Sequence, residues 1–206
     1  MFLDLHSSTS LAERLGNVDY HLLLKEFFSD ITTPILENNG SIYQYVGDEV
    51  VVAWNHRNEI ENNSCVKCFF DIRRVIDDKK EWYLERFGVV PAFKAAIHCG
   101  KIVAGEIGII KRDITFSGDV LNTTARIQSM CKVFEAELIV SNDVAQTLNL
   151  LNRYALKPLG HIKLRGKEKE LLLSAVERCL IAKRSKFRIG YFQKYLHMWE
   201  CERRRN

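Results

Sequence analysis

The sequence predicts an α+β fold with a ferredoxin-like, split βαβ core, in which helices cover one face of an antiparallel sheet. Short apolar runs typical of strands alternate along the chain with segments whose apolar residues recur at helical spacing. Their order is strand, helix, strand, strand, helix, strand, which is the order of a split βαβ unit. With 206 residues and 47% hydrophobic content, the chain can bury a core without disulfides or a structural metal.

The first half of the chain contains the elements of this core. The apolar run at the start ends in Asp4-Leu5, and the serines and threonines that follow are typical helix caps. Two later apolar strands are separated only by Gly47-Asp48, a junction short enough to predict a hairpin. In chain order we expect a strand at 1–5, a turn at 5–9, a helix at 19–38, strands at 41–46 and 49–54, and a helix at 61–86.

The second half adds a C-terminal α/β extension. Gly100 separates two apolar runs that follow Pro91, and Gly166 lies at the centre of the last predicted hairpin. We expect strands at 92–99, 101–108 and 114–117, a helix at 119–131, a strand at 138–140, a short helix at 143–148, and a hairpin at 162–176.

The positive charge of the chain is concentrated at its C-terminal end. Residues 181–206 contain eight Lys or Arg and two Glu, so the remainder of the chain has a net charge of −2. A main domain with this charge has no basic field for nucleic acid, and we expect no nucleic-acid partner. The change in composition predicts one globular domain at 1–178 and a basic, aromatic tail at 179–206.

Two interpretations of this tail remain open. One is an amphipathic segment that meets an anionic membrane surface or a partner, and the other is a solvated, partly disordered extension. Its apolar residues, interleaved with Lys and Arg, are Phe187, Ile189, Tyr191, Phe192, Tyr195, Leu196 and Trp199.

The expected location of the chain is cytoplasmic. No apolar run approaches the roughly 18 residues that suggest a membrane span. The six cysteines are scattered without framework spacing and follow no secretory signal, which favours a reducing compartment.

Asp4 and Asp48 are the first candidates for chemistry. Because the strands that carry them are neighbours in such a core, both carboxylates can converge at one edge of the sheet. Two carboxylates with open coordination positions suit Mg²⁺, which usually shares its ligand shell with substrate phosphates. The adjoining turn at 5–9 offers backbone N–H groups and a helix N-terminus, which together bind anions. The structural alternative is that Gly47-Asp48 is only a hairpin turn and the serines are only caps.

Histidine and cysteine offer weaker candidates. His6, His98 and His161 form no metal-spaced cluster, so we expect structural roles for them. Cys65 and Cys68 have the spacing of half a zinc site, but no second pair lies at finger spacing, so both are expected on a helix face.

Five segments, in the same order, resemble the signature motifs of class III adenylate and guanylate cyclases. The resemblance as a whole spans residues 2–177, and the segments include a first-strand Asp, a Gly-Asp hairpin and a paired Asn and Arg. The segments are FLDLHSSTSLAERLG, YQYVGDEVVVAW, AAIHCGKIVAGEIG, FSGDVLNTTARIQSM and LRGKEKEL.

The resemblance implies binding roles for matching positions. Asp4 and Asp48, with the Leu5 carbonyl as an extra ligand, would bind two Mg²⁺ or Mn²⁺ ions per site. The phosphates of the nucleotide would be held by the residues of the first turn and by two basic side chains. These phosphate-binding residues are Ser7, Ser8, Thr9, Lys94 and Arg165.

The resemblance also implies a homodimer with shared sites. Asn122 and Arg126 of the partner subunit would orient the ribose and stabilise the charge that develops on the α-phosphoryl group. Gln44 and Thr115 occupy the two base-reading positions. The implied reaction converts ATP into 3′,5′-cyclic AMP and pyrophosphate, by in-line attack of the ribose 3′-hydroxyl on the α-phosphorus.

Two departures from the family pattern keep alternatives open. Adenine-specific members often have Lys at the position of Gln44, whereas a glutamine amide both donates and accepts and can meet guanine as well. A guanylate cyclase is therefore the first alternative. The first strand normally has several residues ahead of the position of Met1, so a shortened strand with low activity, or a silent regulatory and dimerisation module, is the second. A diguanylate cyclase, another palm-type enzyme, matches Gly47-Asp48 only superficially.

Overall fold

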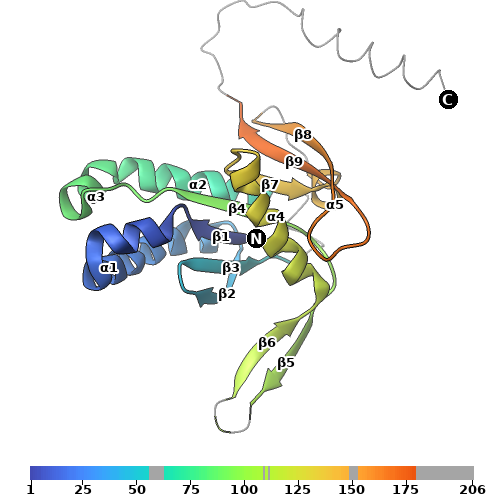
Figure 1. Cartoon of the computed structure of the whole chain (residues 1–206), viewed down its shortest axis with the longest axis horizontal. Coiled ribbons are helices and arrows are strands. Elements are labelled where there is room, and N and C mark those ends of the chain that lie inside the picture. The colour runs from blue at the N-terminus through green and yellow to red at the C-terminus, as the bar shows by residue number, and fades with distance from the viewer. Residues whose placement is uncertain (56–62, 109, 111, 149–152, 180–206) are drawn as a thin grey trace, which may run out of the picture.

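The sheet is the central layer of the molecule. The computed structural model describes residues 1–55, 63–108, 110, 112–148 and 153–179. Seven strands form one sheet in the order β2-β3-β1-β4-β7-β9-β8, and β5 and β6 pair separately as an arm that projects from it (Figure 1). The strands are β1 (Phe2–Leu5), β2 (Ser41–Val46), β3 (Glu49–Ala53), β4 (Phe93–Ile97), β5 (Val103–Ile107), β6 (Asp113–Ser117), β7 (Leu138–Ser141), β8 (Tyr154–Ile162) and β9 (Leu171–Arg178).

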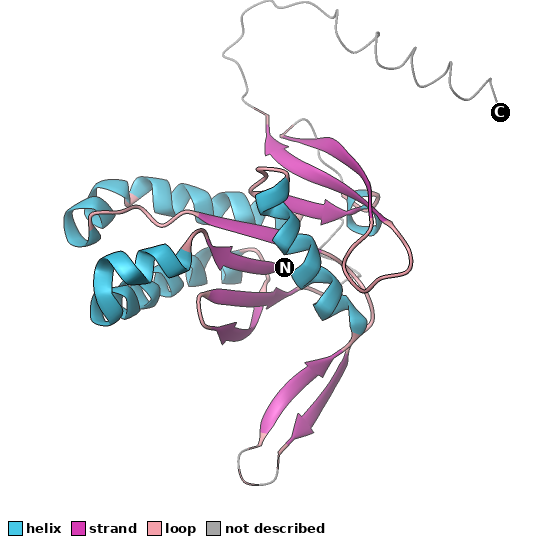
Figure 2. Ribbon diagram, in the orientation of Figure 1, coloured by secondary structure: helices cyan, strands magenta, loops and turns pink. Residues whose placement is uncertain are grey.

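Helices pack on both faces of this sheet (Figure 2). The larger core lies between α1, α2 and the sheet, where Phe27 and Phe69 pack against Leu3. On the opposite face, Ile127 of α4 packs against Ala96 and other buried residues in a smaller core. The helices are α1 (Ser8–Glu37), α2 (Ser64–Asp78), α3 (Lys80–Phe87), α4 (Asp119–Val133) and α5 (Asn142–Ala145).

The alternation of side chains along β1 separates the core from the site. Leu3 and Leu5 are almost completely buried in the larger core, and Asp4 between them faces α4. β1 pairs antiparallel with both β3 and β4, which places Asp4 opposite Glu49 on one side and opposite Lys94 on the other. A strand paired on both edges holds its carboxylate on a rigid support.

The predicted fold class is confirmed, and the structure refines two features of it. α4 covers the face opposite to α1 and α2, so the helices are not confined to one face. The β4–β7 pair is parallel, whereas the other pairs in the main sheet are antiparallel.

Three predicted elements have clearly different bounds. The helix expected at 19–38 is the later part of α1, which already begins at Ser8 and contains one non-helical residue, Gly16 (φ 74°, ψ 164°). The helix expected at 61–86 is two helices, because the backbone leaves helical geometry at Lys79 (φ −95°, ψ 10°). The C-terminal hairpin is longer than expected, since β8 begins at Tyr154. Pro158 and Gly160 are unfavourable within most strands, so the sequence did not predict β8. The strand nevertheless forms because it lies at the edge of the sheet, where proline is tolerated, and its register shifts between these two residues.

The expectation for Cys65 and Cys68 agrees with the structure. Both are free thiols on the buried face of α2, and burial raises their pKa to about 11 and about 12 respectively. None of the helices in the described ranges combines the length and apolar character that crossing a membrane requires. The tail predicted at 179–206 lies, apart from Cys179, outside the described residues.

Candidate active site

Asp4 and Asp48 meet at one edge of the sheet. Asp48 lies in the tight turn between β2 and β3, where Gly47 adopts the left-handed conformation (φ 62°) that the turn needs. Since Glu49 is the cross-strand partner of Asp4, the preceding Asp48 lies beside Asp4 as well. Burial, and then a hydrogen bond and charge from Asp48, raise the pKa of Asp4. The two carboxylates therefore lie side by side, which agrees with the convergence expected from the sequence.

Glu49 adds a third acidic group, which was not predicted from the sequence. Burial raises its pKa to about 7, with further contributions from the charges of Asp4 and Asp48. Within the described residues, no group of three or more His, Cys, Asp and Glu side chains is arranged to hold a metal ion. A metal at this edge would therefore rely on Asp4 and Asp48, with backbone, substrate or water oxygens completing its ligand shell.

The turn between β1 and α1 lies next to this pair. Ser7 has a left-handed backbone (φ 57°), and its hydroxyl contacts His6 Nδ1 at 2.8 Å instead of capping the helix. The first backbone N–H groups of a helix lack partners within the helix, so those of Ser8 and Thr9 are oriented to bind an anion. Tyr20 lies near both the turn and the carboxylates. Burial and then the charge of Asp48 raise the pKa of its hydroxyl, and a hydrogen bond with Ser8 partly offsets this shift.

Two side chains reach Asp4 from neighbouring elements. Lys94 on β4 places its ammonium nitrogen 3.4 Å from Asp4 Oδ2. Gln128 on α4 donates from Nε2 to the same oxygen at 2.9 Å. Lys94 was predicted to bind phosphate, and its position at the carboxylate pair is compatible with that role. Gln128 was missed, because no local pattern connects it to a strand 124 residues away.

Asn122 and Arg126 lie on the outward face of α4. Asn122 is exposed and Arg126 half-buried, and their spacing of four residues places them on the same side of the helix. Between the described residues, no hydrogen bond or ion pair joins them to Asp4 or Asp48. A single chain thus presents the carboxylates and the Asn–Arg pair as two separate groups.

Arg165 lies close to Arg126. The guanidinium of Arg126 packs against the backbone of Gly166, where a β-carbon would lie 3.4 Å from the nearest guanidinium nitrogen. In the same loop, Lys167 forms an ion pair with Asp119 in the first turn of α4. The loop between β8 and β9 therefore lies against α4, and the structure brings Arg126 and the exposed Arg165 to one surface.

Gln44 and Thr115 occupy elements that touch each other. The N–H of Phe116 on β6 donates to the Tyr43 hydroxyl on β2 at 2.5 Å, and the two rings stack. Gln44 and Thr115 are the chain neighbours of these two residues. A cavity of about 120 Å³, mostly apolar, lies beside Phe116 and is lined by Phe2, Val51 and Leu121 among others.

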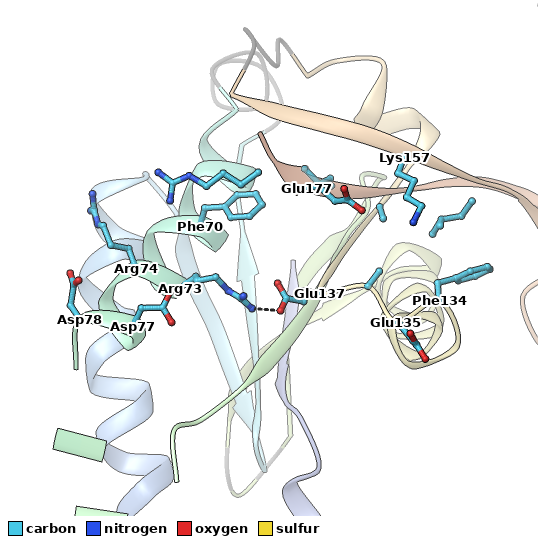
Figure 3. Close-up of a pocket in the computed structure, with 15 residues that line it drawn as sticks. Phe70, Arg73, Arg74, Asp77, Asp78, Phe134, Glu135, Glu137, Lys157 and Glu177 are labelled. Carbon is cyan, nitrogen blue, oxygen red and sulfur yellow. Dashed lines mark ion pairs between the residues drawn. The ribbon is translucent and has the colours of Figure 1, made fainter. Parts of the chain in front are cut away.

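A more voluminous groove lies elsewhere in the described structure. It has a volume of about 640 Å³ and is bounded by α2, the segment before β7, and strands β8 and β9. Figure 3 shows Arg73 from α2 reaching across it to Glu137, with which it forms an ion pair of 2.6 Å. Its lining includes none of the residues predicted for the site. The groove is therefore separate from the predicted site residues.

Comparison with known proteins identifies the family. The family model described as "Adenylate and Guanylate cyclase catalytic domain" matches residues 1–175. The chain belongs to this family. It is 36% identical over 171 residues to "Adenylate cyclase 2" of Rhizobium meliloti (strain 1021), covering 83% of this chain and 47% of that protein. The cyclase domain thus spans about half the length of this relative.

Solved structures agree with the cyclase fold. The adenylyl cyclase CyaB from P. aeruginosa superposes with a TM-score of 0.70 at 18% identity, covering 90% of this chain and 94% of that one. The guanylate cyclase domain of RhGC from Catenaria anguillulae, solved in complex with GTP, gives 0.67 at 16% identity, covering 86% and 93%. Cyclases of this family use divalent metal ions.

Proposed function

We propose that this cyclase domain converts ATP into 3′,5′-cyclic AMP and pyrophosphate. The observation that carries the proposal is the position of Asp4, at the end of β1, beside Asp48, in the β2–β3 turn, next to the Ser7–Thr9 turn, in a chain of the cyclase family. Carboxylates next to an anion-binding turn suit a triphosphate that arrives with divalent ions. The relative from Rhizobium meliloti, which is named an adenylate cyclase, supports ATP as the substrate.

The donor set at Asp4 and Asp48 fits a hard divalent ion. Burial, and then the hydrogen bond and charge of Asp48, raise the pKa of Asp4, and a cation bound to both carboxylates would offset the burial and the repulsion between them. We propose that two ions, Mg²⁺ or Mn²⁺, use these carboxylates and the Leu5 carbonyl. When bound, such ions lower the pKa of the ribose 3′-hydroxyl and neutralise charge on the departing pyrophosphate.

The phosphates would be held by the first turn and by basic side chains. The backbone N–H groups of Ser8 and Thr9 and the hydroxyl of Ser7 supply donors at a helix N-terminus. Lys94 lies beside Asp4, from where its ammonium can bind a phosphate oxygen once the carboxylate is neutralised by an ion. Arg165, on the exposed loop, would contribute from the other subunit.

Asn122 and Arg126 would complete the site across a homodimer. Their outward position on α4 makes them available to a second copy of the chain, whereas the carboxylates of the same chain lie on a different surface. A guanidinium remains protonated and offers forked donors, so Arg126 suits an α-phosphoryl group that gains charge in the transition state. Asn122 would orient the ribose so that its 3′-hydroxyl lies in line with the leaving group.

The β5–β6 arm supports the homodimer. Its strands pair only with each other, and isolated two-stranded ribbons are marginally stable in water. The arm exposes apolar side chains, with Val103 71%, Ile107 58% and Ile114 72% exposed. A second copy of the chain that covers these side chains would stabilise the arm and bring Thr115 to the shared site.

Guanylate cyclase activity is the second candidate, favoured by Gln44. Its amide both donates and accepts, so the base position does not exclude guanine as a lysine would. The decisive experiment incubates the purified protein with Mn²⁺ or Mg²⁺ and either ATP or GTP, and resolves the products by chromatography. We expect cyclic AMP and pyrophosphate from ATP at the higher rate. No cyclic nucleotide from either substrate, in a folded dimer, would refute the proposal.

A further inference from the structure

Gln128 connects α4 to the carboxylate pair. It lies on the inward face of the helix with 7% of its surface exposed, and its side-chain amide donates to Asp4 Oδ2 at 2.9 Å. We propose that Gln128 is a positioning residue that holds the Asp4 carboxylate in the orientation in which it binds a divalent ion. This inference rests on the proposed function, because it assigns Asp4 to the metal.

Two donors converge on one oxygen of Asp4. Gln128 Nε2 lies 2.9 Å and Lys94 Nζ 3.4 Å from Oδ2. They come from different elements on the same face of the sheet, since Lys94 is the cross-strand neighbour of Asp4 on β4 and Gln128 belongs to the helix that covers this face. A carboxylate accepts about four hydrogen bonds or metal contacts. With Oδ2 engaged in this way, the rotation of the carboxylate is restricted and its remaining lone pairs stay available to an ion.

An amide suits this position better than a charged group. A lysine or arginine at 128 would place a second positive charge, in addition to Lys94, beside the carboxylate that has to attract the cation, and a glutamate would add a further negative charge. An apolar residue would leave a half-buried oxygen of Asp4 with one donor fewer. A neutral donor orients the carboxylate and leaves its negative charge available to the metal ion. Residues that hydrogen-bond to metal ligands usually have this role.

The two faces of α4 would serve two different active sites of the dimer. Its inward face holds Asp4 of the same chain, whereas Asn122 and Arg126 on its outward face would serve the site that uses the partner's carboxylates. Loss of the Gln128 amide should therefore act on the site to which its own chain supplies Asp4, and not on the other.

Metal binding without turnover tests the first part. The variant Gln128→Met removes the donor and keeps the length of the side chain. Mn²⁺ would be titrated into wild type and variant by electron paramagnetic resonance, in the presence of 3′-deoxy-ATP, which lacks the attacking hydroxyl. We expect about a tenfold or greater increase in the Mn²⁺ dissociation constant. Ile127→Val, the adjacent core substitution, controls for loss of packing and should leave it unchanged.

Mixed dimers test where the amide acts. In a mixture of Asp48→Ala and Arg126→Ala chains, the intact site takes its carboxylates from the Arg126→Ala chain. Adding Gln128→Met to that chain should raise the Mn²⁺ concentration for half-maximal activity with a smaller effect on kcat. Adding it to the Asp48→Ala chain should not. If the substitution raises the required Mn²⁺ concentration equally in either chain, Gln128 acts through the packing of α4, and the positioning role is refuted.

The outcomes separate this inference from the proposed function. Unchanged Mn²⁺ affinity in Gln128→Met, with wild type binding the ion and forming cyclic nucleotide, overturns only the positioning role. Wild type that binds no Mn²⁺ and forms no cyclic nucleotide overturns the proposed function as well. If Gln128→Met fails to fold, Gln128→Asn keeps a neutral amide and shortens the side chain by one methylene, so that its donor no longer reaches Asp4. The same loss of affinity is expected, and normal affinity refutes the proposal.

Discussion

The rings of Tyr43 on β2 and Phe116 on β6 are stacked, with centroids 3.9 Å apart and an interplanar angle of 6°. The Tyr43 hydroxyl also accepts a hydrogen bond from the Phe116 N–H. Tyr43 lies where the β2–β3 register shifts, which directs its side chain away from the ladder and toward the arm. This contact joins the arm to the main sheet at the two residues that adjoin Gln44 and Thr115.

Replacement of Tyr43 should loosen the arm. Tyr43→Ala removes the stacking, worth about 0.5–1.5 kcal/mol, and the hydrogen bond, worth about 1 kcal/mol. We expect weaker dimerisation, measured by sedimentation equilibrium, and a higher KM for the nucleotide. Tyr43→Phe keeps the stacked ring and loses only the hydrogen bond, so its dimerisation and its KM should change less than those of Tyr43→Ala. If Tyr43→Ala dimerises as wild type does, the arm is not part of the subunit interface.

Removal of either carboxylate should abolish turnover and preserve the fold. Asp4→Asn keeps an oxygen that can accept from Gln128, and Asp48→Ala removes a side chain from a surface turn. Each loses a proposed metal ligand, so we expect kcat to fall by at least about a thousandfold, an estimate for loss of electrostatic stabilisation at the reacting phosphate. Activity assays would be paired with circular dichroism to verify folding. Rates near wild type in either variant would refute the metal assignment.

Mixing two inactive variants should restore activity. Asp48→Ala and Arg126→Ala each inactivate both sites of their own homodimer. One of the two sites in the mixed dimer has an intact carboxylate pair and an intact Arg126, because the two groups come from different chains. We expect up to about one quarter of wild-type activity after random exchange of equal amounts, because half of the dimers would be mixed, each with one intact site. A mixture that stays inactive, although mass spectrometry detects mixed dimers, would contradict the shared-site arrangement.

Gln44→Lys should sharpen the preference for ATP. Lysine has donors only and cannot pair with the donor groups of guanine, whereas the glutamine amide can. A buried donor of the wrong substrate left unpaired costs about 1–3 kcal/mol, or roughly 5-fold to 150-fold in relative kcat/KM. The measurement is kcat/KM for ATP and GTP in both proteins. An unchanged ratio would show that residue 44 does not face the base.

Much of this protein was predictable from local sequence. Hydrophobic periodicity identified the later part of α1, from residue 19, and the strand pair β2–β3, and the short Gly47-Asp48 junction located the turn that brings Asp48 beside Asp4. These features depend on residues close in the chain, because strand and helix periodicities and tight turns are local properties. The fold class followed from the order of the elements, which restricts how a split βαβ unit can assemble.

Other features were decided only by the tertiary structure. Gln128 reaches Asp4 because α4 crosses the face of the sheet opposite to α1, and no local pattern encodes which face a helix covers. Local sequence likewise does not predict the contact of Arg126 with Gly166, because the two residues lie on different elements. It does not predict β8 either, since the proline of this strand is tolerated only at the edge of the sheet. Local sequence determined the elements and the carboxylate pair. Packing between distant segments determined what surrounds that pair, because a side-chain contact depends on the position of both backbones.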